Sequence, residues 1–141
     1  MIRVVFDTSV LYSAILKPKG VPAAVFDFVG SGLVIPCVSP AVLAEYRGVL
    51  LERSSLRPYA GRALLVLDIL ATVAVEVTPS HTLKISEHES DNRFHECADA
   101  ASADYIVTGN LTHFKQPHQD IRIVNPRQLL DLLTTGQGIA P

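Results

Sequence analysis

The chain has 141 residues, of which 48% are hydrophobic and 18% are charged, and its formal net charge is -2. A composition this apolar excludes an intrinsically disordered chain and allows one sizeable core, so we expect a single domain. The slightly negative charge excludes a surface that is basic throughout, although four arginines cluster in one short stretch: Arg47, Arg53, Arg57 and Arg62.

Cysteine content and hydropathy indicate the compartment. The two cysteines, Cys37 and Cys97, form no CxxC pair, which argues against a structural zinc site or a disulfide scaffold. Met1 is followed directly by a strand-like run, and no stretch approaches the ~20 apolar residues of a membrane span. We therefore expect a soluble cytoplasmic protein with no membrane partner.

The first expected element is a strand at Ile2–Phe6, an apolar run that is broken only by Arg3 and stops at Asp7. Runs of this kind are typical of strands buried on both faces of a parallel sheet. Helices are expected next at Thr8–Leu16 and Pro22–Val29, the second ending at Gly30-Ser31-Gly32.

A strand is expected at Leu33–Val38, where Pro36 limits the ladder to a short piece or an edge. Ser39-Pro40 then predicts a helix start, because serine caps helices well and proline suits the first helical position. The remaining expected elements, in order, are a helix from about Pro58 to Leu70, a strand at Val73–Val77, a loop at Pro79–Glu89, a helix at Asn92–Ala103 capped by Asp91, strands at Tyr105–Thr108 and Ile121–Val124, and a helix at Pro126–Leu133.

Alternation of strands and helices predicts an α/β domain with a mostly parallel sheet. We expect this single domain to cover residues 1–135, followed by a short C-terminal tail at 136–141.

Acids follow or adjoin the strands of this predicted sheet. Ligands of parallel α/β sheets bind outside the carboxyl ends of the strands, where Asp7, Glu45 and Asp91 are expected to converge. Each has a simpler interpretation: Asp7 and Asp91 suit helix caps, and Glu45 suits the rim of an apolar helix face. Together, three carboxylates would repel one another unless a hard divalent cation such as Mg²⁺ lay between them. Such a site suits phosphodiester hydrolysis by an activated water molecule.

Four segments carry a resemblance to the PIN-domain family, and to its branch of toxin components of toxin–antitoxin systems (VapC-like). They are Val5-Phe6-Asp7-Thr8-Ser9, the run from Ser39 to Tyr46, Asp91-Asn92-Arg93-Phe94, and the run from Ala103 to Asn110. The resemblance implies a five-stranded parallel sheet in the order 3-2-1-4-5 and an endoribonuclease that depends on Mg²⁺ or Mn²⁺. It also implies an RNA substrate, a cognate antitoxin and a homodimer.

The family's metal-binding acids carry over onto Asp7, Glu45 and Asp91, and its fourth acidic position falls on Asn110. An amide oxygen can accept hydrogen bonds but brings no negative charge. Compensation by Glu96, Asp99 or Asp104 is one possibility, and Asp99 is the best placed, at about 80° round the helix from Asp91. A catalytically weakened module that binds RNA or protein is the alternative function.

Five histidines raise the question of zinc, but a surface position is favoured for His81 and His88, which fall in a predicted loop. His95 shares Asp91's side of its helix, and His113 is a candidate to touch a phosphate. Two other doubly wound classes are disfavoured: receiver domains need adjacent acids after the first strand, and haloacid-dehalogenase-type enzymes need an acid where Ser9 stands.

Overall fold

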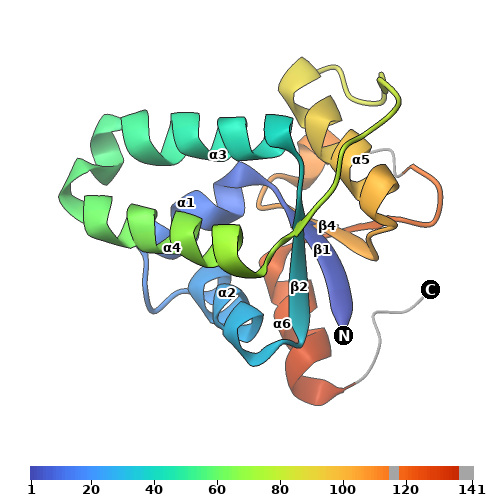
Figure 1. Cartoon of the computed structure of the whole chain (residues 1–141). Helices are drawn as coiled ribbons and strands as arrows, with labels where there is room; N and C mark the ends of the chain where they lie inside the picture. Colours follow the sequence, from blue (N-terminus) through green and yellow to red (C-terminus); the bar gives the residue numbers. More distant parts are fainter. Residues whose placement is uncertain (115–117, 137–141) are drawn as a thin grey trace.

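Five strands pair in parallel in the order β3-β2-β1-β4-β5, as shown by the computed structural model, which describes residues 1–114 and 118–136 (Figure 1). The strands are β1 (Ile2–Phe6), β2 (Val34–Val38), β3 (Val75–Glu76), β4 (Tyr105–Val107) and β5 (Arg122–Val124). The predicted α/β class and strand order are confirmed. The central strand β1 lies in the core, since Val4, Val5 and Phe6 are almost inaccessible to solvent.

Helices cover both faces of the sheet. They are α1 (Thr8–Leu16), α2 (Val21–Ser31), α3 (Pro40–Glu52), α4 (Ala60–Val73), α5 (Glu89–Ala101) and α6 (Pro126–Thr135), with short 3-10 helices η1 (Ser54–Tyr59) and η2 (Leu111–Phe114). Helix α5 packs against β1, β2 and β4, whereas α1, α2 and α4 contact the sheet from the other side, where α6 packs on α2 (Figure 1). Helices α3 and α4 lie side by side as a hairpin closed by η1.

Several helix ends follow from local side-chain chemistry. The Ser39 hydroxyl accepts a hydrogen bond from the Val42 amide at 3.1 Å, with Pro40 in the first turn of α3, as predicted. Helix α2 ends at Gly32, whose φ of +81° is a left-handed conformation that glycine adopts without strain. Asn125 and Gln128 form a reciprocal capping box at the start of α6.

The region between α3 and β3 differs from the prediction. Residues 54–59 form η1, and α4 then continues to Val73, so the strand predicted at Val73–Val77 shortens to Val75–Glu76. The buried face of α4, formed by Ala63, Val66 and Leu70 at helical spacing, lies within the predicted helix, and the added residues end at Val73, which is 44% exposed.

Pro36 lies in β2, which is an internal strand, so the edge position considered for it is wrong, whereas the short ladder is confirmed. The Val38 carbonyl faces β3, where it accepts the Val77 amide at 2.8 Å. The backbone groups of successive residues in a strand point alternately to the two neighbouring strands, so the backbone of Pro36 points toward β3, as that of Val38 does. The pairing of β2 with β3 begins only at Cys37. The missing amide hydrogen of Pro36 therefore removes no ladder hydrogen bond.

The C-terminal helix ends at Thr135, capped by Gly136 with a φ of +70°. The predicted tail lies outside the described residues from position 137 onward. Among the residues that the structure describes, no helix has the length and apolar character needed to cross a membrane.

Candidate active site

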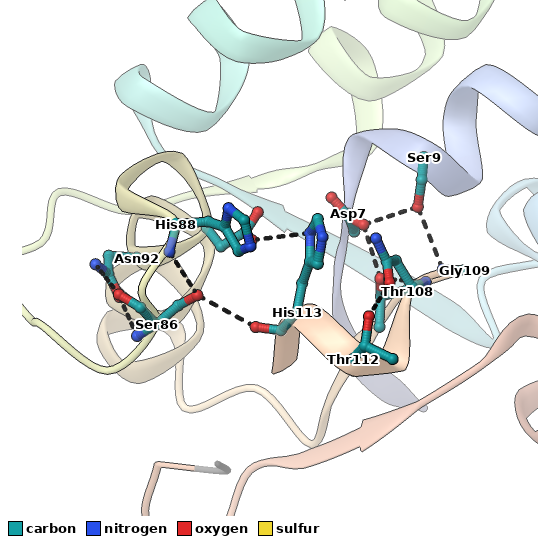
Figure 2. A network of polar contacts seen from close by, with 11 residues as sticks. Asp7, Ser9, Ser86, His88, Asn92, Thr108, Gly109, Thr112 and His113 are labelled. Atoms are coloured by element: carbon teal, nitrogen blue, oxygen red, sulfur yellow. Dashed lines mark hydrogen bonds and ion pairs between the residues drawn. The ribbon is translucent and has the colours of Figure 1, made fainter. Parts of the chain in front are cut away.

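Asp7 stands at the carboxyl end of β1, and only 9% of its surface is exposed. Its Oδ2 atom accepts hydrogen bonds from the hydroxyls of Ser9 and Thr108, both at 2.7 Å (Figure 2). The Ser9 hydroxyl in turn accepts the Gly109 amide at 3.2 Å. Asp7 occupies the cap position of α1 but makes no side-chain cap bond, so the capping interpretation is wrong. The carboxylate is instead held by the segment that follows β4.

Glu45 reaches the same edge because of its neighbour Tyr46. The buried Tyr46 hydroxyl donates a hydrogen bond to the carbonyl of Phe6, the last residue of β1. Burial raises the pKa of Tyr46 well above its ordinary value, with a smaller contribution from Asp7, so the phenol stays neutral and donates. This contact fixes α3 against the end of β1 and leaves Glu45 half-buried beside it.

Asp91 lies in the first turn of α5, and the prediction that it caps the helix is wrong. The helix begins at Glu89, with His88 as the cap residue, and the Asp91 amide bonds back to the His88 carbonyl at 2.9 Å. Asp91 is 7% exposed, and its Oδ2 atom has no hydrogen-bond partner. A buried carboxylate oxygen without a partner is unfavourable, which marks this position as a candidate cation ligand.

Electrostatics link the three acids. Burial raises the pKa of Asp91, and the charges of Asp7 and Glu45 raise it further, whereas His113 and His88 lower it. Asp7 and Glu45 therefore lie close enough to Asp91 for their charges to act on it.

Asn110, the fourth predicted site residue, lies in the segment that follows β4. Its amide N–H donates to the Thr108 hydroxyl at 3.0 Å, and its side-chain oxygen accepts the Thr112 hydroxyl at 2.6 Å. The Thr108 hydroxyl thus joins the backbone of Asn110 to the carboxylate of Asp7. The side-chain oxygen of Asn110 keeps a second lone pair for another partner.

The acids considered as substitutes for Asn110 have other partners. Asp104 accepts the Arg3 amide at 2.9 Å, near the amino ends of the strands, and Asp99 lies 3.4 Å from His118. Asp99 and Asp104 line one pocket at that opposite edge, so the expectation that Asp99 compensates is wrong. Glu96 accepts the Leu83 amide at 2.8 Å and pairs with Arg93 at 2.9 Å.

Sequence reasoning missed the arrangement of the histidines. His88 is exposed, as predicted, but its ring stacks on that of His113 with centroids 4.1 Å apart, and His113 Nδ1 lies 3.3 Å from Asp91 Oδ2. The feature of the sequence that could have indicated this arrangement is the position of His88, three residues before Asp91. His81 is exposed, whereas His95 is buried beside Phe114 and lines the same pocket as His88 and His113.

Comparison with known proteins identifies the family. The family described as PIN domain matches residues 3–112, and the chain belongs to this family. It is 32% identical over 129 residues to the uncharacterised protein MJ1680 of Methanocaldococcus jannaschii, covering 88% of this chain and 82% of that protein.

Solved structures show the same fold at low sequence identity. A chain of VapBC2 from Rickettsia felis, bound to a promoter DNA fragment, superposes with a TM-score of 0.60 at 18% identity, covering 87% of this chain and 98% of that chain. A chain of DNA-bound VapBC from Salmonella typhimurium superposes with a TM-score of 0.60 at 16% identity, covering 89% of this chain and 99% of that chain. A chain of FitAB bound to a DNA fragment superposes with a TM-score of 0.56 at 20% identity, covering 87% of this chain and 94% of that chain.

Proposed function

We propose that this chain is a cytoplasmic endoribonuclease that depends on Mg²⁺ or Mn²⁺ and hydrolyses RNA phosphodiester bonds. The observation that carries the proposal is that Asp7, which follows β1, and Glu45 on α3 lie close enough to Asp91 on α5 for their charges to raise its pKa. Membership of the PIN-domain family supports it.

The donor set fits a hard divalent cation. Three carboxylates offer the oxygen ligands that Mg²⁺ and Mn²⁺ prefer, and the buried Oδ2 atom of Asp91 lacks a partner that a cation would supply. We assign Asp7, Glu45 and Asp91 as the residues that would hold the ion. When bound, the ion would lower the pKa of a water molecule and neutralise charge on the phosphate.

The chain's own groups would orient this site. The hydroxyls of Ser9 and Thr108 both donate to Oδ2 of Asp7, so the carboxylate cannot rotate freely, and it keeps lone pairs on Oδ1 for a cation. Burial of Asp7 and Asp91 lowers the local dielectric, which strengthens their attraction for a cation.

Arginines near α3 and α4 support binding of a nucleic-acid backbone. Arg62 donates to the Ala14 carbonyl at 3.0 Å, and Arg53 lies over the Tyr12 ring at 6.0 Å, so these two also hold α1. Arg47 and Arg57 are exposed. We assign Arg47 and Arg57 as phosphate contacts, which would supply affinity and position without reading bases.

The decisive test is cleavage of single-stranded RNA with Mn²⁺ by the wild type and by Asp7→Asn. Loss of one carboxylate charge from the ion's ligand set should reduce the rate by about 100-fold or more, a barrier increase of about 2.7 kcal/mol. Asp131→Asn changes an exposed acid on α6 in the same way and should cleave normally. Equal rates for wild type and Asp7→Asn would refute the proposal.

The alternative function is a weakened PIN-like module that binds RNA or protein without cleaving. Asn110 favours it, because this residue brings no charge where the family has an acid. Calorimetry with Mn²⁺ separates the two: absence of binding at millimolar ion would support the module.

We further propose that the chain acts as the toxin of a toxin–antitoxin pair, because its structural neighbours are VapBC and FitAB complexes. Leu64 and Leu65 on α4 are more than half exposed, and Phe26, Ile69 and Val73 line a largely apolar groove between α2 and α4. This surface suits an amphipathic segment of an antitoxin. Co-expression with the product of a small neighbouring gene should yield a stable complex that Leu65→Glu weakens. The expected homodimer remains a prediction, which light scattering of the purified chain tests.

A further inference from the structure

Three side chains that face one another beside the acid crevice carry a different donor set. His88 precedes α5, Asp91 lies in its first turn, and His113 belongs to η2. One potential ligand atom from each lies within 4.8 Å of the other two. The imidazole rings of His88 and His113 stack on each other, with their centroids 4.1 Å apart (Figure 2).

The contact between His113 and Asp91 is close but is not a hydrogen bond. His113 Nδ1 lies 3.3 Å from Asp91 Oδ2, yet that oxygen is buried without a hydrogen-bond partner. Two ligands at about 2.0 Å from a zinc ion in tetrahedral geometry lie about 3.3 Å apart. The observed spacing fits an ion pair between Asp91 and a protonated His113, and it equally fits two ligands of one metal ion, which would satisfy the buried oxygen.

Hydrogen bonds to Ser86 hold the two histidine segments together. The Ser86 hydroxyl donates to the His113 carbonyl at 3.2 Å and accepts the His88 amide at 3.1 Å (Figure 2). The buried Asn92 fixes Ser86 in turn, since its side-chain oxygen accepts the Ser86 amide at 2.7 Å and its side-chain nitrogen donates to the Ser86 carbonyl at 3.1 Å. Such supporting contacts are what orient metal ligands in proteins.

We propose that His88, Asp91 and His113 form a site for a transition-metal ion of the zinc class. Imidazole nitrogen is a good ligand for Zn²⁺, Co²⁺ and Ni²⁺, whereas Mg²⁺ prefers oxygen alone. Two histidines and one carboxylate supply three ligands, and water completes the tetrahedron. The inference touches the proposed ribonuclease only through Asp91, which belongs to both ligand sets.

The test is calorimetry of the full, tag-free chain with Zn²⁺ alone, together with the absorption spectrum of the Co²⁺ form. Wild type should bind one Zn²⁺, and His88→Ala and His113→Ala should each weaken binding by more than about tenfold. His113→Gln provides a second, more conservative variant, and thermal melts of each variant report whether it is folded. His81→Ala removes an exposed histidine from the same loop and should bind as wild type does.

Asp7→Asn separates this inference from the proposed function. It should abolish cleavage of RNA with Mn²⁺ but retain zinc affinity, because Asp7 is no part of the histidine site. Failure of wild type to cleave RNA would leave zinc binding untouched. Absence of zinc binding, or binding that depends on Asp7 and not on the two histidines, would overturn the inference.

Discussion

At the scale of single residues, Asn110 stands at the position onto which the family's fourth acid falls. Its side-chain oxygen accepts the Thr112 hydroxyl, and its backbone bonds to the hydroxyl that holds Asp7. The residue is thus well supported but uncharged. A site with three carboxylates and one amide attracts a divalent cation less strongly than a site with four carboxylates.

Replacing Asn110 by Asp should therefore strengthen Mn²⁺ binding by about three- to tenfold, because one more negative charge faces the ion at almost unchanged volume. Without metal the same substitution should lower the melting temperature, since the added charge repels Asp7 and Asp91. Calorimetry and thermal melts with and without Mn²⁺ measure both effects. An unchanged affinity would place position 110 outside the metal centre.

Among the elements, the segment before α5 depends most on side chains for its backbone hydrogen bonds. The Asn92 side chain satisfies the amides of Ile85 and Ser86, and Glu96 satisfies the amide of Leu83. Because these residues belong to no strand or helix, the side chain of one buried asparagine accepts the backbone hydrogen bonds that a neighbouring strand would otherwise accept.

Asn92→Ala should release this segment, since it leaves the buried amides of Ile85 and Ser86 without acceptors, at a cost of about 2 kcal/mol in the free energy of unfolding. Hydrogen exchange should rise across residues 83–88 and stay unchanged in α6. Asn92→Asp retains the accepting oxygens but loses the donations to the Ser86 carbonyl and the Glu89 carboxylate, so its protection should fall between that of wild type and that of Asn92→Ala. Equal exchange in wild type and Asn92→Ala would contradict this role.

At the scale of the whole molecule, His95 makes stability depend on pH. Its ring is buried, both ring nitrogens lack partners, and burial lowers its pKa from 6.5 to about 4, with His118 adding to the effect. Below pH 6.5 the unfolded chain binds a proton at this residue, whereas the folded chain does so only near pH 4. Stability is therefore complete above pH 6.5 and falls as the pH drops toward 4.

This difference is worth about 3 kcal/mol at the acid end, since each pKa unit corresponds to about 1.4 kcal/mol. His95→Leu should remove that part of the pH dependence, so its free energy of unfolding should vary less between pH 7 and pH 4.5 than that of the wild type. Urea unfolding at several pH values measures this. Parallel curves for the two proteins would show that His95 is not the titrating group.

The sequence alone predicted the features that depend on local pattern. The apolar run at Ile2–Phe6 predicted a buried strand, and Ser39-Pro40 predicted the start of α3. The convergence of three acids was expected from their positions at or near the carboxyl ends of parallel strands, whereas the strand order came only with the family resemblance. Element ends were less predictable: α4 continues past Leu70 to Val73, into the predicted third strand.

Only the tertiary structure decided which side chains surround Asp91. His88 and His113 are 25 positions apart and meet because Ser86 and Asn92 hold the loop before α5 against η2, and no periodicity in the sequence records such contacts. The three acids likewise share a crevice only because parallel strands end at one edge and Tyr46 fixes α3 there. Local hydropathy and caps determined the elements of this protein, whereas the chemistry of its site arose from contacts between distant segments.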